Sequence, residues 1–94
     1  MLYVVIAKDG TDEAAPERRQ QVRLQHLEGI KPAVESGFLQ LGGAFLNSQG
    51  DMIGSMMMLE ANSEEEVRAF LEKDIYRKAN VWQSYEVYPF KRAV

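Results

Sequence analysis

The sequence has 94 residues, which is the length of one small domain spanning 1–94 rather than of two domains. Its formal net charge of −3 comes without a basic stripe, which argues against nucleic acid as a partner, and no apolar run approaches the roughly 20 residues of a membrane span. Because cysteine is absent, we expect no disulfide and no thiolate zinc site, as is typical of a cytoplasmic protein.

The first half of the chain predicts a strand followed by a long helix. The strand is "LYVVIAK", a run of β-branched and aromatic residues that ends at an Asp-Gly turn. The helix runs from about Pro16, which suits a first helical position, to about Ser36, and Gly37 follows as a C-cap. Pro32 removes a backbone hydrogen bond inside this helix, which predicts a kink near residues 29–30. We expect its buried stripe to consist of Leu27, Ile30 and Val34.

The second half predicts two strands, a helix, a short helical turn and a last strand. The strands "FLQLGGAFLN" and "MIGSMMMLEA" are joined by the hairpin turn "NSQGD". The segment "NSEEEVRAFLEKD" is a helix that begins with a capping box of Ser63 and Glu66. Asp74 is the expected N-cap of the short turn that follows, and "WQSYEVYPFKRAV" contains the last strand.

The order β-α-β-β-α-β predicts a ferredoxin-like α+β fold, with a four-stranded antiparallel sheet and helices on one face. The strands are apolar on both faces, whereas a sheet with one solvated face alternates apolar and polar residues. In the first strand, the two faces carry Leu2, Val4 and Ile6 against Tyr3, Val5 and Ala7. Since a large exposed apolar patch marks an interface, we expect a homodimer in which sheet packs on sheet.

His26 is the only histidine, and histidine is the side chain whose charge ordinarily changes near neutral pH. On a helical wheel it lies roughly 70–80° to one side of the predicted apolar stripe. It is therefore either a histidine at the edge of the core with a satisfied hydrogen bond, or a reactive general base. Both interpretations stay open from the sequence.

Arg23 lies in line with the same stripe, one turn nearer the N-terminus. A buried guanidinium needs an anionic partner or solvent. Three interpretations follow for Arg23: it binds a ligand carboxylate, it forms an intramolecular salt bridge, or it emerges past the end of the sheet.

Asp74 is the second candidate for chemistry. Its ordinary role is to cap the short turn, and a capping carboxylate can also orient an imidazole. A His–Asp pair holds one tautomer and makes the imidazole a better general base. The neighbouring aromatic residues, Tyr76 and Trp82, have core packing as their ordinary role. The pair Gly42-Gly43 inside a strand is typical of a bulge or of close approach by another group.

Other kinds of site find little support in the sequence. One histidine and no cysteine argue against a metal centre. There is no phosphate-binding loop and no dinucleotide fingerprint, since Gly42-Gly43 has the wrong spacing. We therefore expect neither a metal nor a cofactor.

The chain resembles the YciI-like (YCII-related) family of small bacterial proteins over nearly its full length. The resemblance rests on the order and spacing of several motifs: "MLYVVIAKDG" at the start, "R-x-x-HL" at 23–27, "G-x-L-x-x-GG" at 37–43, "D-x-Y-x-x-A-x-V" at 74–81 and "YEVYPFKR" near the end. It implies a dimer of ferredoxin-like subunits and an active site built around a histidine and an aspartate, which map to His26 and Asp74. One branch of the family resembles dehydrochlorinases that act on chlorinated hydroxyquinols.

Together these inferences give two hypotheses of function. The first is a cofactor-free enzyme of the isomerase or lyase type, in which His26 is the general base and Asp74 orients it. Its substrate would be a small hydroxylated or carbonyl-bearing organic molecule, and we assign substrate binding to Arg23, Gly42, Gly43 and Tyr76. The alternative is a non-catalytic dimer, which either binds a small molecule or a protein partner or has a purely structural role.

Overall fold

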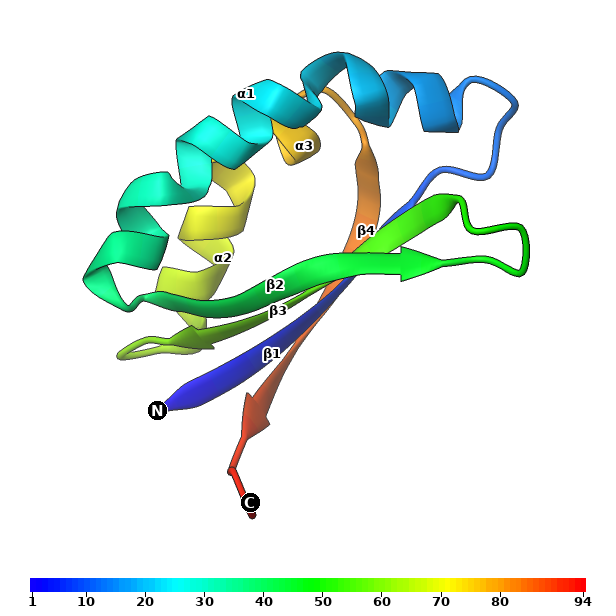
Figure 1. The fold of residues 1–94 in the computed structure, drawn as a ribbon. Coiled ribbons are helices and arrows are strands. Elements are labelled where there is room, and N and C mark those ends of the chain that lie inside the picture. Colours follow the sequence, from blue (N-terminus) through cyan, green and yellow to red (C-terminus); the bar gives the residue numbers. More distant parts are fainter.

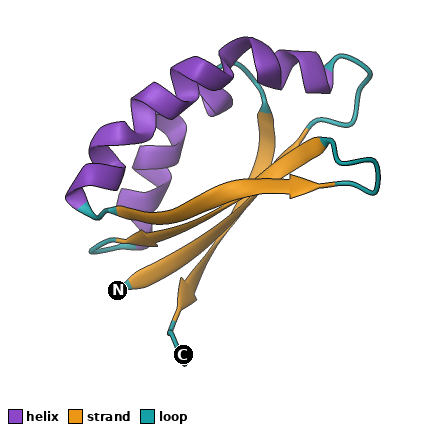
Figure 2. Ribbon diagram, in the orientation of Figure 1, coloured by secondary structure: helices purple, strands orange, loops and turns teal.

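The computed structural model describes residues 1–94 and has the predicted order of elements. In chain order these are β1 (Leu2–Asp9), α1 (Ala15–Ser36), β2 (Leu39–Leu46), β3 (Met52–Glu60), α2 (Glu64–Lys73), α3 (Ile75–Lys78) and β4 (Trp82–Phe90). The strands form one antiparallel sheet in the order β2-β3-β1-β4. All three helices lie on the same side of this sheet (Figures 1 and 2). The predicted ferredoxin-like α+β fold is confirmed.

The core lies between the helices and the helix-facing side of the sheet. Alternate β1 residues point into it, so that Val5 and Ala7 are fully buried while Val4 and Ile6 are only half-buried. Successive side chains of a strand point to opposite faces of the sheet, so the residues of β1 that face the helices are buried more deeply than those that face away from them. The largest fully buried side chains are Trp82, Tyr76, Leu59 and Leu71.

The orientation of α1 differs from the prediction. We expected Leu27, Ile30 and Val34 to form its buried stripe, with His26 at the flank. Instead Arg19 and His26 are 3% and 9% exposed, whereas Leu27 and Val34 are 41% and 53% exposed. Ile30 does pack against the core, so the prediction was wrong for Leu27 and Val34. It failed there because it assumed that apolar residues alone decide which face is buried. Polar side chains are buried when other elements supply hydrogen-bond partners, and a helical wheel contains no information about those elements.

The predicted helix boundaries hold closely. Gly37 ends α1 in the left-handed conformation with φ 83°, as a C-cap glycine does. The helix continues through Pro32 as one element, and Figure 1 shows it curving along the sheet. At α2, the Ser63 side chain accepts a hydrogen bond from the Glu66 backbone N–H at 3.2 Å. The Glu66 carboxylate reaches the backbone N–H of Asn62 at 3.3 Å rather than that of the capping serine.

The side of the sheet that faces away from the helices is apolar, as the strand patterns predicted. Large apolar side chains are exposed there on both edges of the sheet: Leu41 is 55% exposed, Phe45 41%, Tyr88 45% and Phe90 43%. We call this surface the open face. An apolar surface of this kind on a small domain is typical of an interface.

Candidate active site

His26 and Asp74 meet, although 48 residues separate them in the chain. The Nδ1 atom of His26, on α1, lies 2.8 Å from Oδ1 of Asp74, and the two side chains are 10% and 4% exposed. The same Oδ1 accepts the backbone N–H of Tyr76 at 2.9 Å, which makes Asp74 the N-cap of α3 as predicted. Asp74 therefore caps the helix and holds the imidazole with one oxygen.

Two aromatic rings fix the plane of the imidazole. The ring of Tyr76 stacks on His26 with centroids 3.8 Å apart and planes 5° from parallel. Trp82 contacts His26 edge-on, with centroids 5.8 Å apart. Tyr76 is completely buried, and its hydroxyl has no hydrogen-bond partner. The structure places Tyr76 beneath the imidazole and outside the cavity described below, so its position suits support of His26 rather than contact with a substrate.

The second ring nitrogen of His26 is free. When Nδ1–H donates to the carboxylate of Asp74, a neutral imidazole carries its lone pair on Nε2. Nε2 makes no hydrogen bond within the protein, and it is accessible to solvent. This is the arrangement that a general base requires: one nitrogen oriented by a carboxylate and the other available to accept a proton.

His26 borders a cavity of about 380 Å³ that lies between α1 and strands β2 and β3. We call it the His26 cavity. Its size falls in the range of small-molecule sites in proteins. The apolar stripe of α1 that was expected in the core lines this cavity instead. Its polar wall consists of His26, Arg19, Arg23, Gln40, Ser55 and Trp82.

Gly42 and Gly43 also line the His26 cavity, at the centre of β2. A Cβ atom at Gly42 would lie 3.7 Å from Met57 Cγ, an ordinary contact, and a Cβ at Gly43 would meet nothing. The pairing of β2 with β3 is irregular on either side of the glycines, between Leu39 and Leu41 and again near the end of the strand. The absence of a side chain at Gly42 therefore leaves the β2 backbone open to the cavity, and packing against neighbouring atoms does not require a glycine there. Gly43 lies on the same side of β2 as the exposed residues Leu41 and Phe45.

Arg23 also lines the cavity and is half-buried. It makes no ion pair with any carboxylate, and its one side-chain contact is from Nη1 to the sulfur of Met52 at 3.8 Å. Of the three interpretations drawn from the sequence, the intramolecular salt bridge is therefore not made. The guanidinium remains available to an anionic group in the cavity.

The sequence did not reveal a buried ion pair beside the candidate site. Nη1 of Arg19 donates to both oxygens of Asp9, at 3.0 and 2.9 Å, and both side chains are 3% exposed. Nη2 of Arg19 donates to Ser55 Oγ at 3.0 Å, and the indole N–H of Trp82 donates to the same oxygen at 3.1 Å. The Arg19 guanidinium also lies 4.8 Å from the ring centroid of Tyr76, in a cation–π contact.

One signal could have found this ion pair. Asp9 ends the first strand on the same side as Tyr3, Val5 and Ala7, which are core residues, so a period of two places a carboxylate in the core. A buried carboxylate requires a cationic partner. Asp9 was interpreted only as part of a turn, and for that reason no cationic partner was assigned to it.

Other expected features remain without a test. No group of three or more His, Cys, Asp or Glu side chains is arranged to hold a metal ion. No helix combines the length and the hydropathy that crossing a membrane would require. The expectations of no cofactor and of a cytoplasmic location stay predictions.

The fold and the site define a class: a small ferredoxin-like α+β subunit with a buried His–Asp pair beside a cavity. The sequence profile of the YCII-related domain matches residues 1–91. The chain therefore belongs to the YCII-related family, and the family predicted from the motifs is confirmed.

Relatives of known sequence come from bacteria and fungi. Protein YciI of Escherichia coli is 33% identical over 98 residues, an alignment that covers 98% of each chain. Fusaric acid biosynthesis protein 2 of Gibberella fujikuroi is 31% identical, over 95% of this chain and 91% of that protein. Aspartate kinase FUB3 of Fusarium oxysporum is 32% identical over 97% of this chain, but the chain spans only 18% of that much longer protein.

Solved structures share the fold. 5-Chloro-2-hydroxyhydroquinone dehydrochlorinase (TftG) from Burkholderia phenoliruptrix, in complex with 2,5-dihydroxybenzoquinone, superposes with a TM-score of 0.86 at 28% identity, covering 99% of this chain and 96% of that one. A dimeric ferredoxin-like protein of unknown function from Jannaschia superposes with a TM-score of 0.54 at 16% identity, over 97% of this chain and 98% of that one. The second likeness concerns the fold alone.

Proposed function

We propose that the protein is a cofactor-free enzyme of the lyase or isomerase type, acting on a small hydroxylated or carbonyl-bearing organic molecule. The observation that carries the proposal is the 2.8 Å contact between His26 and Asp74 at the wall of a cavity of about 380 Å³. An oriented imidazole with a free nitrogen is suited to take a proton from a hydroxyl group or from a carbon next to a carbonyl.

Each predicted site residue has a place in this scheme except Tyr76. Nε2 of His26 accepts the proton, and the Asp74 carboxylate stabilises the imidazolium that forms. Arg23, which has no carboxylate partner in the protein, binds the oxyanion that the substrate develops. Gly42 and Gly43 let the substrate approach the β2 backbone. The proton then returns at another atom, or a leaving group departs.

The name of the TftG relative supplies a first substrate to assay, 5-chloro-2-hydroxyhydroquinone. Removal of HCl from this compound gives 2-hydroxybenzoquinone and is internally balanced. One hydroxyl proton ends on the carbon that loses chloride, and a second leaves as HCl. The ring is oxidised to the quinone as the carbon–chlorine bond is replaced by a carbon–hydrogen bond, so no external oxidant is required.

The test compares turnover and stability in three variants. We expect His26→Gln and Asp74→Asn to lower kcat for chloride release by about 100-fold or more, because each removes part of the general base. Asparagine caps helices about as well as aspartate, so Asp74→Asn should retain most of the stability of α3. Glu28→Gln, on the exposed side of α1, is the control and should keep full turnover. Undiminished turnover in His26→Gln would contradict the proposal.

A second candidate function is binding of a small molecule without turnover. The apolar wall that Leu27, Ile30 and Val34 give the His26 cavity favours it, because burial of apolar surface provides affinity without chemistry. In that case wild type and His26→Gln would bind 2,5-dihydroxybenzoquinone equally well, and neither would release chloride from the chlorinated substrate.

We further propose that two copies of the chain pair through their open faces. The exposed apolar side chains on that surface support the pairing, as does the small size of the chain, since a domain of about 60–100 residues buries a limited share of its surface alone. The fold of the Jannaschia protein, which is described as dimeric, is compatible with it.

A further inference from the structure

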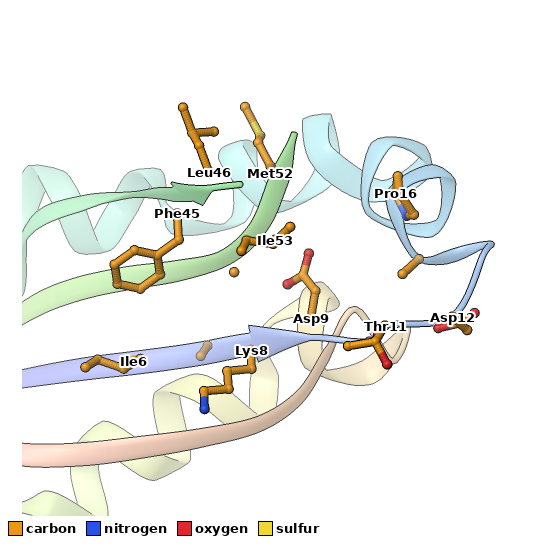
Figure 3. Close-up of a pocket in the computed structure, with 14 residues that line it drawn as sticks. Ile6, Lys8, Asp9, Thr11, Asp12, Pro16, Phe45, Leu46, Met52 and Ile53 are labelled. Atoms are coloured by element: carbon orange, nitrogen blue, oxygen red, sulfur yellow. The ribbon is translucent and has the colours of Figure 1, made fainter. Parts of the chain in front are cut away.

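A second cavity lies at one end of the sheet and belongs to no part of the proposed reaction. It has a volume of about 650 Å³ and extends between the end of β1, the start of β3 and the segment 10–16 that leads into α1. In Figure 3, Asp9 points from the end of β1 toward Ile53 on β3, and Ile6 on β1 and Phe45 on β2 lie to the left of them. We call it the loop cavity. Most of its wall is apolar.

The two cavities adjoin each other near the start of β3. Met52 lines both the loop cavity and the His26 cavity. Beside it, Asp9 lines the loop cavity and Arg19 lines the His26 cavity, and these two residues bond directly at 2.9 Å. Met52 and the Asp9–Arg19 ion pair therefore form part of the partition between the two cavities.

Met52 is the movable part of this partition. Its sulfur has a single polar contact, with Arg23 Nη1 at 3.8 Å, and the residue is half-buried. Methionine is unbranched and flexible, so it changes rotamer at little cost. The ion pair cannot move in the same way, because the Arg19 side chain is held by Asp9 and Ser55 at once.

The loop cavity also extends beyond the open face. Ile6 and Phe45 belong to that face, but Asp9 and Ala15 lie on the helix side of the sheet and are 8% and 6% exposed. A second copy that packs flat on the open face would close one mouth of the cavity without filling its inner part. Met52 is the one residue that lines both this cavity and the His26 cavity.

We propose that the loop cavity holds an apolar substituent of the same ligand whose polar ring lies at His26, and that Met52 is the movable divider between them. The inference rests on the proposed function and adds a substrate class to it: a hydroxylated or carbonyl-bearing ring with an alkyl side chain of several carbons. The chain discriminates such substrates by the length of that side chain.

The test is calorimetric binding of 2,5-dihydroxybenzoquinone and its 3-ethyl, 3-butyl and 3-hexyl derivatives to the full chain. Each methylene that enters the apolar cavity is expected to raise the affinity about fourfold. Ile53→Trp and Thr11→Trp fill the loop cavity from two different segments, neither of which lines the His26 cavity. Both variants should bind the unsubstituted quinone as wild type does and lose the gain with chain length, whereas the matched control Ile53→Val should keep it.

Every other outcome overturns the inference. Equal affinity for all four quinones in wild type, or a gain that persists in both tryptophan variants, shows that the substituent lies elsewhere. A change in sedimentation of the tryptophan variants without any effect on the gain assigns the cavity to a second copy of the chain. If neither the unsubstituted quinone nor any derivative binds, the proposed substrate class fails together with this inference. If the unsubstituted quinone binds but the affinity does not rise with chain length, only this inference fails.

Discussion

At the scale of single residues, the site depends on atoms that serve two purposes. Oδ1 of Asp74 accepts one hydrogen bond that starts α3 and another that orients His26. The orientation of the imidazole and the capping of α3 are thus linked through one carboxylate. The sequence supplied both residues, His26 as the only histidine and Asp74 as a helix cap, but their contact is set by the way α1 and α3 pack together.

Tyr76 stacks on the imidazole of His26 without lining the His26 cavity. Its hydroxyl is buried and has no partner, which costs free energy that a phenylalanine would not lose. We therefore predict that Tyr76→Phe keeps turnover within about twofold and is as stable as wild type or more so, because the ring still stacks on His26.

The measurement is thermal unfolding together with the chloride-release assay. Tyr76→Leu serves as the comparison, since it keeps an apolar side chain but loses the stacked ring, and we expect both stability and turnover to fall. A large loss of turnover in Tyr76→Phe without a loss of stability would contradict this prediction and would indicate that the hydroxyl contacts the substrate.

At the scale of elements, the Asp9–Arg19 ion pair fixes α1 against the end of β1. Loss of one partner from a buried pair leaves an uncompensated charge, which costs about 3–5 kcal/mol. We predict a loss of this size in the free energy of unfolding of Arg19→Met, measured by urea titration. Replacing both residues, as Asp9→Leu with Arg19→Met, should recover most of it.

The neighbouring residue provides a matched control for this prediction. Arg18 pairs with Asp12 at 2.7 Å, but this pair is at the surface and its aspartate side chain is 51% exposed. Exposed pairs contribute little because water screens them, so Arg18→Met should leave the unfolding curve nearly unchanged. Equal effects of Arg18→Met and Arg19→Met would show that the buried pair has no special part in holding α1.

A pH-dependent contact joins α2 to β4. The Tyr85 hydroxyl donates to Glu72 at 2.7 Å and, with Arg77, holds the pKa of the Glu72 carboxyl below its usual range. A carboxyl whose pKa is lower in the folded state adds stability above its unfolded pKa and loses it as pH falls through the folded value. We predict that Tyr85→Phe raises the Glu72 pKa toward its usual value, and that its stability deficit is present at neutral pH and disappears in acid.

This prediction is checked by NMR titration of the side-chain carboxyl carbons and by thermal unfolding at several pH values. The pKa of the Asp12 carboxyl, which is lowered by its hydrogen bond from Arg18, is the internal control and should not move in Tyr85→Phe. A stability deficit that grows as the pH falls would have the wrong sign and would contradict the assignment.

The helices and strands were largely predictable from the sequence. Which side of each element is buried was predictable only in part. Strand patterns such as that of β1 fix the two sides of the sheet because the period of two allows one solution. The α1 sequence has apolar residues that are spread around the helix, so its buried side is decided by Asp9, Ser55 and Asp74 on other elements. Two of these partners, Ser55 and Asp74, are distant from α1 in the sequence, so the buried side of the helix could not be predicted from the sequence alone.

At the scale of the whole molecule, the open face is the surface that the proposed pairing of two copies would bury. We predict that Tyr88→Lys, which puts a charge on the open face, converts a dimer at micromolar concentration to a folded monomer. In the monomer the lysine can pair with Glu86, which already contacts the Tyr88 side chain, so the fold itself should survive. Sedimentation velocity and circular dichroism check the two parts.

Leu24→Lys is the control for this substitution. Leu24 is 72% exposed, but it lies on α1 and therefore on the other side of the sheet. The control should sediment as wild type does. A monomeric wild type, or dissociation of both variants alike, would contradict pairing through the open face.

The position of Trp82 has one more consequence. It is the only tryptophan, it is fully buried, and its indole meets the His26 ring edge-on while it also borders the His26 cavity. Ultraviolet emission from the whole protein therefore originates next to the imidazole, and a protonated imidazole or an incoming quinone will quench it. The molecule thus carries its own optical reporter, through which binding in the His26 cavity can be followed without any label.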